Sequence, residues 1–310
     1  MRINSHIIRS IRDMLSLETI KLALYTGVPL AIFWIGMGWL LWDPLTAFTI
    51  KVISWIPFSV VRANGAFIII FFLWFAAVLI SYALFVGLFS GLLLAQKEES
   101  KFEAINFGTI FGLAIFWAVV IFASWPTLSQ KIEYYLTLLP FQTVAEGIAW
   151  LLAIHIIYNL FLISEYFVVF LFREPYIAAL LEKHYPDCSI TDSGLRAKAF
   201  GRLTRDTLLY IPLFLLLLPL IFIPVANFLA TWFLWAWLYK ESAFLGVCSL
   251  LCDDGVYSEL REHKGIFFLI SLLSALLNFI PIISIFTPFF VFTLYFHWIM
   301  EERKARGVSC

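Results

Sequence analysis

Residues 66–95 read AFIIIFFLWFAAVLISYALFVGLFSGLLLA, thirty residues without a single charge. A helix needs about 20 apolar residues to cross the hydrocarbon core of a bilayer, so this stretch alone predicts a membrane span. The whole chain agrees, because 62% of its 310 residues are hydrophobic, 14% are charged and its mean hydropathy is +0.93. Soluble domains are about 45–50% apolar and about 25% charged. The composition therefore excludes a soluble enzyme, a secreted disulfide scaffold and a nucleic-acid-binding domain.

Three further segments have the length and apolarity of a span, at 22–42, 105–125 and 144–172. The interval 43–65 mixes prolines and charges with apolar residues, which is typical of an amphipathic segment at the membrane interface. The interval 126–143 is short and charged, and it predicts a polar turn. The sequence therefore predicts an all-α, polytopic membrane protein with four long spanning helices.

Two later apolar segments, 208–239 and 266–300, differ from these spans because prolines interrupt them. Each proline removes a backbone donor and disfavours helix in the residue before it. The segments are related at an offset of 57 residues, since 223–227 aligns with 280–284. Broken near the middle, each gives two legs of about 14 residues, or about 20 Å, which enter the bilayer without crossing it. We therefore predict two proline-broken, hemi-penetrating helical hairpins, each returning to its starting side.

The positive charges favour this topology. With a cytoplasmic N-terminus, four crossings and two returning hairpins, 18 of the 21 Lys and Arg residues lie in the cytoplasm. A single crossing by each broken segment would give 15 against 6, so the positive-inside rule favours the hairpins. Both termini and the segments 96–104, 173–207 and 240–265 are then cytoplasmic. The prediction is one integral membrane domain over 1–310, divided into 1–21, the spans 22–172, the cytoplasmic 173–207, the hairpins 208–300 and the tail 301–310.

Four residues near the broken segments are candidates for an anion path. Arg202 and Arg205 lie on neighbouring helix faces just before the first segment. They form either an electropositive entry for an anion or an anchor to anionic lipid. Asn227, and Thr287 directly before Pro288, lie where the second legs would begin. As N-caps they would mark helix starts whose amides attract an anion, or they would only satisfy the backbone breaks.

The fourth predicted span contains two further candidates, His155 and Glu165. Titratable residues are costly at membrane depth and indicate a functional site by default, here a path for protons or ions. The alternatives are a neutral, hydrogen-bonded histidine and a glutamate near the interface. The chain has no Walker A, HExxH or GxSxG motif, so we expect no enzyme, no metal and no cofactor. The spacing of the four cysteines predicts no disulfide.

Residues 173–183 read REPYIAALLEK. This run resembles the Pro-aromatic-x-x-x-Leu-x-Glu segment that follows the long second span in the CysZ-type sulfate permeases. The similarity continues in order through 202–206, 210–212, 232–239 and 277–284, with 10–16 near the N-terminus. By these motifs the chain resembles the CysZ-type sulfate permease family, which is grouped with the etoposide-induced membrane proteins.

The resemblance implies two long spans plus two hemi-penetrating hairpins in the cell inner membrane, and sulfate as substrate. The segments 66–95 and 105–125 look like an added helical pair, and 18–21, which read ETIK, replace the family's Gly-Leu-Arg-type sulfate motif. We therefore expect a permease or channel for a small anion, sulfate-like by resemblance. The alternative is a non-transporting membrane factor that organises lipids or assists other membrane proteins. The expected partners are the lipid bilayer, a small anion and further copies of the chain in a homo-oligomer, with no nucleic acid.

Overall fold

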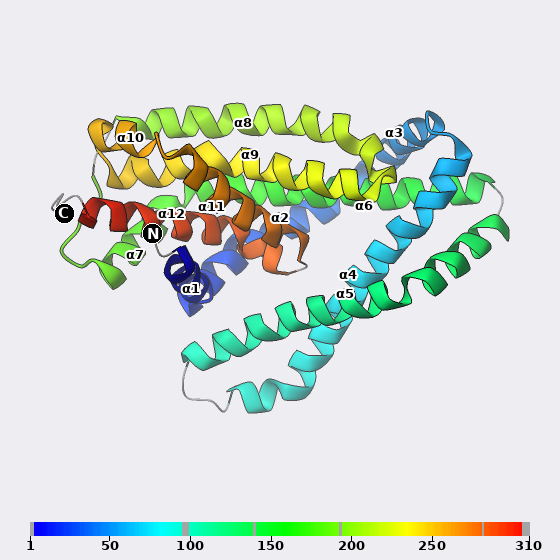
Figure 1. Ribbon diagram of the computed structural model, residues 1–310, viewed down its shortest axis with the longest axis horizontal. Coiled ribbons are helices and arrows are strands. Elements are labelled where there is room, and N and C mark those ends of the chain that lie inside the picture. The colour runs from blue at the N-terminus through cyan, green and yellow to red at the C-terminus, as the bar shows by residue number, and fades with distance from the viewer. Residues whose placement is uncertain (1–2, 95–98, 139–140, 192–193, 281, 306–310) are drawn as a thin grey trace.

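The computed structural model describes residues 3–94, 99–138, 141–191, 194–280 and 282–305 (Figure 1). Every regular element in these residues is a helix, and six helices are long and apolar enough to cross a membrane. The prediction of an all-α, polytopic membrane protein is confirmed. In chain order the elements are α1 (Ile3–Met14), α2 (Leu17–Leu40), α3 (Trp42–Ser54), α4 (Phe58–Leu94), α5 (Glu99–Leu138), α6 (Phe141–Leu171), α7 (Arg173–His184), α8 (Leu195–Leu217), η1 (Leu218–Phe222), α9 (Pro224–Leu251), α10 (Asp254–Leu260), α11 (Lys264–Leu276), η2 (Leu277–Phe279), η3 (Ile283–Phe286) and α12 (Thr287–Ala305).

The four predicted spans correspond to α2, α4, α5 and α6, and the predicted interfacial segment contains α3. Helices α4 and α5 pair along their length and extend away from the other helices (Figure 1). Helix α5 continues through Pro126 to Leu138, so the polar turn predicted for 126–143 is wrong up to that residue. Ile132 and Leu136 give the reason, because they pack in an apolar cluster with the start of α6. Their burial outweighs the cost of one interior proline.

The proline-broken segments are interrupted where the repeat predicts. The 3-10 helices η1 and η2 end at Phe222 and Phe279, which are 57 residues apart. The predicted leg length is wrong for the first segment, because α8 has 23 residues and α9 has 28; only α11, with 13, is close to 14. These helices continue into polar sequence rich in good helix formers, which hydropathy does not count. Pro281 lies outside the described residues, and hemi-penetration of the membrane stays a prediction.

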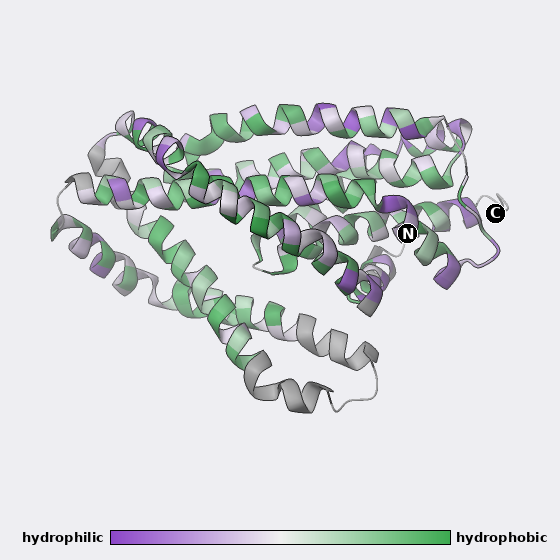
Figure 2. Ribbon diagram, turned by 180° about the vertical axis from the view of Figure 1, so that it is seen from behind, coloured by the Kyte–Doolittle hydropathy of each residue, from purple (hydrophilic) through white to green (hydrophobic). Residues whose placement is uncertain are grey.

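Most of the polar segments meet at one end of the molecule. Both described ends of the chain lie there, and so do α7 and α10 (Figure 1). This end of the molecule also carries a concentration of hydrophilic residues (Figure 2). The backbone N–H of Thr191 donates to the carbonyl of Leu250 at 2.8 Å, which ties the segment before α8 to the end of α9. The geometry agrees with a shared side for 173–207 and 240–265. That this side is cytoplasmic stays a prediction, and residues 96–98 and 306–310 lie outside the described part.

Helix α12 lies in the centre of this arrangement. All residues from Thr287 to Met300 are buried, and α1, α6, α7, α9 and α11 pack around them. A helix that is hydrophobic on every face belongs in a core, which is what this position provides. At the C-terminal end of α9, Cys248 and Cys252 form a disulfide, so the prediction of none is wrong. Their spacing of four places both sulfurs on one face of the helix.

Candidate functional site

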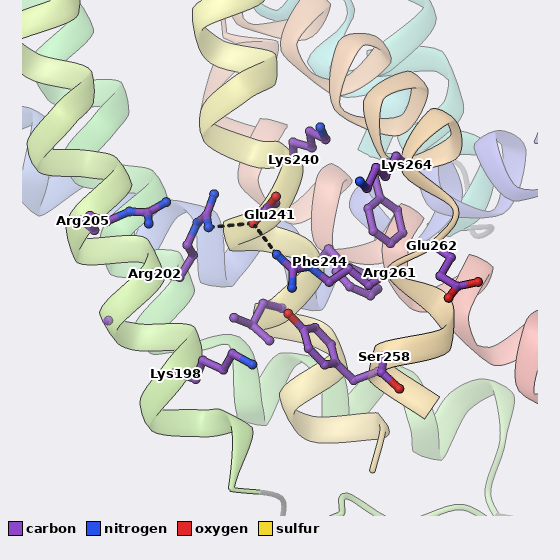
Figure 3. A pocket seen from close by; sticks show the side chains of 14 residues that line it. Lys198, Arg202, Arg205, Lys240, Glu241, Phe244, Ser258, Arg261, Glu262 and Lys264 are labelled. Atoms are coloured by element: carbon purple, nitrogen blue, oxygen red, sulfur yellow. Dashed lines mark ion pairs between the residues drawn. The ribbon is translucent and has the colours of Figure 1, made fainter. Parts of the chain in front are cut away.

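A cavity of about 700 Å³ lies at the hydrophilic end, between α8, α9, α10 and the start of α11 (Figure 3). Charged side chains dominate its lining, six of them basic and two acidic. A recess with an excess of one charge raises the local concentration of ions of the opposite charge. We name this cavity the basic vestibule and define it by its charged residues Lys198, Arg202, Arg205, Lys240, Glu241, Arg261, Glu262 and Lys264.

Helix α8 supplies three of the basic residues, Lys198, Arg202 and Arg205. Residues three and four apart share one face of a helix, so all three point to the same side of α8. The sequence-predicted pair Arg202 and Arg205 therefore lies in one cavity, as Figure 3 shows. This placement is what an electropositive entry requires, and the lipid-anchor alternative does not require it.

Three other basic residues of the basic vestibule were missed as site residues. Sequence analysis counted Lys240, Arg261 and Lys264 only toward the membrane topology, yet they line the cavity from α9, the end of α10 and the start of α11. The signal was their position directly outside the apolar segments 208–239 and 266–300. If both segments begin and end on the same side, these residues lie on that side, and the fold brings them to one cavity.

An ion-pair network orders the arginines. Asp206, whose side chain is 1% exposed, lies 2.7 Å from Arg202 Nε and 2.9 Å from Arg205 Nη2. Arg202 Nη1 is also 2.7 Å from the carboxylate of Glu241, and Arg261 approaches the same oxygen at 3.9 Å (Figure 3). A buried carboxylate is tolerated only with such partners. The network therefore fixes the guanidinium groups, while the basic residues of the lining still outnumber the acidic ones.

A second cavity, of about 170 Å³, lies against α4 and the break in the first hairpin. It brings together two sequence-predicted residues, His155 and Asn227, and we name it the inner cavity. Asn159 Nδ2 lies 3.3 Å from His155 Nε2, so the histidine has the neutral hydrogen-bonding neighbour that the alternative reading required. Aromatic side chains form much of the wall, and its polar lining residues are His155, Tyr158, Asn159, Asn227, Thr231 and Asn278.

The predicted N-caps are wrong. Helix α9 begins at Pro224 with Ile223 as its N-cap, because the fixed φ of proline suits the first helical position. Asn227 therefore lies one turn inside the helix, and its backbone N–H donates to Ile223 O at 2.8 Å. Thr287 already has helical backbone angles behind η3, and its buried hydroxyl has no hydrogen-bond partner among the described residues. Neither side chain caps a second leg.

Three buried aromatic residues of α8 and α9 contact one another close to residues that line the two cavities. Ring centroids of Tyr210 and Trp235 are 4.9 Å apart, and those of Trp235 and Tyr239 are 5.4 Å apart. Trp235 lines the inner cavity whereas Lys240, which follows Tyr239, lines the basic vestibule, and five helical residues span about 7.5 Å. Asn278, also in the inner cavity, donates to Tyr239 Oη at 2.9 Å. We name Tyr210, Trp235 and Tyr239 the aromatic layer.

Glu165 lies in neither cavity lining. It is fully buried on α6, and both of its carboxylate oxygens lack a hydrogen-bond partner among the described residues. It packs closely against α2, since a Cβ added to Gly27 would lie 3.1 Å from Oε1. A glutamate near the interface, the alternative in the sequence analysis, would be exposed to water or headgroups. The carboxylate is shielded by protein on all sides, and its depth in the membrane stays a prediction.

A cluster that sequence analysis missed joins α1, α7 and α12 at the hydrophilic end. The carboxylate of Asp13, 1% exposed, lies 2.7 Å from His297 Nε2, 2.9 Å from His184 Nε2 and 3.0 Å from Lys183 Nζ. Burial raises the pKa of Asp13, but the hydrogen bonds to these three residues outweigh burial and hold that pKa well below its usual range. By distance, Asp13, His184 and His297 could hold a metal ion. The Lys183 ammonium supplies positive charge to the same carboxylate.

Comparison with known proteins identifies a family for the chain through a match that lies mostly in its second half. A family model described as sulfate transporter CysZ/etoposide-induced protein 2.4 matches residues 104–288. The match contains the basic vestibule and the segment 173–183 that carried the resemblance. It also includes 105–125, so this span has a counterpart in the family, contrary to our expectation, whereas 66–95 lies outside the match. No curated protein and no solved structure matches the chain.

Proposed function

The chain belongs to the family of the sulfate transporter CysZ and the etoposide-induced protein 2.4, and from this premise we propose that it is a permease or channel for a small anion of the sulfate type. The observation that carries the proposal is the basic vestibule. Its lining holds six basic and two acidic side chains, which come from the successive elements α8, α9, the turn after α10 and the start of α11. A merely solvated polar surface would not need to gather these charges around a cavity.

The chemistry of the basic vestibule suits a tetrahedral oxyanion. A guanidinium group presents several N–H donors in a planar fork, and an ammonium group acts as a compact point charge. Arg202 and Arg205 are oriented through Asp206, so their positions are set before an anion arrives. Lys240 and Lys264 add charge to the same cavity. Binding must also stay weak enough for release, which a cavity partly open to water favours.

Passage beyond the basic vestibule needs the aromatic layer to open. In the proposed route Tyr210, Trp235 and Tyr239, which are buried and in mutual contact, would block access to the inner cavity. The amides of Asn227 and Asn278 would be the next donors that an anion meets. The conformation described is therefore a closed one in the proposed mechanism, and rotation of the aromatic side chains is its opening step.

Orientation and assembly complete the proposal. The six basic residues of the basic vestibule are among those that the positive-inside rule assigns to the cytoplasm, so we propose that it faces the cytoplasm in the cell inner membrane. We propose no enzymatic step. The bilayer would cover the exposed apolar side chains. We also propose that the chain forms a homo-oligomer, which a measurement of the protein's mass in nanodiscs tests.

Uptake of radiolabelled sulfate into proteoliposomes tests the function. The informative variant is Lys240→Gln with Lys264→Gln, because neither lysine belongs to the Asp206 network. A partly exposed charge contributes about 0.2–1 kcal/mol, and a dianion feels each charge twice, so losing both should cost about 1–4 kcal/mol. The lower end of this range already corresponds to about a 5-fold loss of uptake at low anion concentration. The matched control removes two charges at exposed positions outside the basic vestibule, Lys51→Gln with Lys131→Gln, and should retain full uptake.

Two results would contradict the proposal in different ways. Equal uptake by both double variants would remove the basic vestibule from the anion path. Sulfate uptake no greater than in protein-free vesicles, with correctly folded protein, would reject a sulfate permease. The non-transporting membrane factor would then be the better account of the chain.

A further inference from the structure

We propose that Asp13, His184 and His297 form a binding site for a divalent transition-metal ion of the zinc type, which fastens α1 to α7 and α12. This inference is independent of the proposed permease function. The three residues come from three different helices, and their ligand atoms all lie within 4.8 Å of one another. They share no local motif, so the search for motifs in the sequence predicted no metal.

The chemistry of the donor set suits zinc. Two imidazole nitrogens and one carboxylate oxygen are the protein ligands of a known type of zinc site, in which water takes the fourth position. His184 Nε2 and His297 Nε2 lie 2.9 Å and 2.7 Å from the same oxygen, Asp13 Oδ2. Zinc lies about 2.0–2.2 Å from such ligands and keeps them about 3.5 Å apart, so outward movements of less than about 1 Å would admit the ion. The carboxylate thus holds both imidazoles in the convergent arrangement that a metal ion requires.

The burial of the site distinguishes it from a chance cluster on the surface. The side chains of Asp13 and His297 are 1% exposed, whereas that of His184 is 27% exposed. The ring centroids of the two histidines are 5.1 Å apart and their planes meet at 73°, so the rings also pack against each other. A metal site needs a path by which the ion enters. His184, at the edge of the cluster, provides that path from water.

Unpartnered polar atoms next to the cluster are an independent observation. Ser10 lies one helical turn before Asp13 on α1, and His6 lies one turn before Ser10, so all three share a face of that helix. Ser10 is 0% exposed and His6 is 3% exposed. Ser10 Oγ, His6 Nδ1 and His297 Nδ1 are buried and have no hydrogen-bond partner among the described residues. Buried polar atoms almost always have partners, so this group of atoms indicates an ion or water that belongs at the interface of α1 and α12.

Lys183 competes with a metal ion for the same carboxylate. Its Nζ lies 3.0 Å from Asp13 Oδ1, and its side chain is 47% exposed. Because like charges repel, the ammonium group must leave as the ion enters, and a half-exposed lysine can turn its charged end into water. On α12, one turn after His297, Glu301 forms an ion pair with His6. Its carboxylate adds negative charge beside the site, which offsets part of the positive charge of the ion.

Binding of zinc alone to the untagged full chain in mild detergent tests the site. The chelated and dialysed chain is the form in which Lys183 and the two histidines share the Asp13 carboxylate. We expect titration calorimetry to show one equivalent of Zn²⁺ bound per chain, and Co²⁺ in its place should give the visible absorption bands of an ion with nitrogen ligands.

Three variants locate the bound ion. Loss of an outer-shell partner costs about 10–100-fold in metal affinity, so His184→Gln, which removes a direct ligand, should weaken zinc binding at least as much. His263→Gln makes the same chemical change at an exposed position outside the cluster and should bind zinc like the wild type. Lys183→Gln removes the competing charge and should bind zinc more tightly than the wild type.

Thermal unfolding shows whether the ion fastens the fold. A ligand that binds only the folded protein raises its melting temperature, so zinc should stabilise the wild type and His263→Gln but not His184→Gln. Absence of stoichiometric zinc binding by the wild type, or equal zinc affinity in the wild type and His184→Gln, overturns the proposal. If His184→Gln fails to fold, Lys183→Gln decides, because zinc binding that is unchanged or weaker in that variant contradicts a site at Asp13.

Discussion

Replacing Asp13 by Asn tests the cluster that fastens α1 to the rest of the molecule. The carboxylate is 1% exposed and lies within 3.0 Å of His297, His184 and Lys183. Hydrogen bonds to a charged group contribute about 1.5–3 kcal/mol each. The Lys183 contact is discounted to about 0.2–1 kcal/mol, because that side chain is half exposed. Asparagine keeps one acceptor oxygen and loses the charge, so we expect about 2–3 kcal/mol less stability at neutral pH.

The stability lost in Asp13→Asn should depend on pH in a definite direction. Because the folded protein holds the pKa of Asp13 below its usual range, the carboxylate stabilises the fold above the unfolded pKa, about 3.9, and this contribution disappears as the pH falls through the folded pKa. The difference between wild type and Asp13→Asn should therefore be constant near neutrality and shrink in acid. Denaturant unfolding in mild detergent at several pH values measures it.

A matched control separates this cluster from a general effect of lost charge. Asp253→Asn makes the same chemical change at an exposed position, where the side chain forms no capping hydrogen bond, and it should change stability by less than about 0.5 kcal/mol. A loss below about 1 kcal/mol in Asp13→Asn would refute the estimate, since a single charge-assisted bond exceeds that value. A loss that stays the same in acid would refute its electrostatic origin.

Two further predictions concern packing and topology. A Cβ at Gly246 would lie 2.7 Å from the Phe170 ring, so Gly246→Ala should destabilise the protein by about 1–3 kcal/mol in thermal unfolding. Gly201→Ala has nothing within 4 Å and should be neutral or stabilising by up to about 1 kcal/mol; a reversed order would contradict the packing around α9. A cysteine at Ser258, in a chain freed of its native cysteines, should react with an impermeant reagent only from the cytoplasmic side. Labelling only from outside would reject the predicted topology.

The sequence predicted the features that depend on composition and chain geometry. The apolar lengths predicted α2, α4, α5 and α6, and the prolines predicted the interruptions at η1 and η2, because both follow from rules that act within about 20 residues. The charge count predicted a shared side for 173–207 and 240–265, with which the geometry agrees. Arg202 and Arg205 were found for the same reason, since helical spacing alone places them on one side of α8.

Features that depend on tertiary packing could not be predicted in this way. Asn227 and Thr287 failed as caps because a shift of one to three residues in the helix start removes a capping role, and Pro224 sets that start for α9. Asp13 contacts His184 and His297, which lie 171 and 284 residues away in the sequence, and no local motif predicts these contacts. The missing partners of Glu165 are likewise a property of the assembled bundle, since a sequence shows the carboxylate but not what surrounds it.

The charge of the basic vestibule does not by itself set the energetics of the proposed transport. Positive charge at one end raises the local anion concentration, yet it does not change the work of moving charge across the membrane. With a negative interior, that work is about 2.3 kcal/mol per elementary charge for each 100 mV, and a dianion entering the cell meets about twice this amount. Because the basic vestibule is proposed to face the cytoplasm, an incoming dianion would reach it only after most of this work has been done.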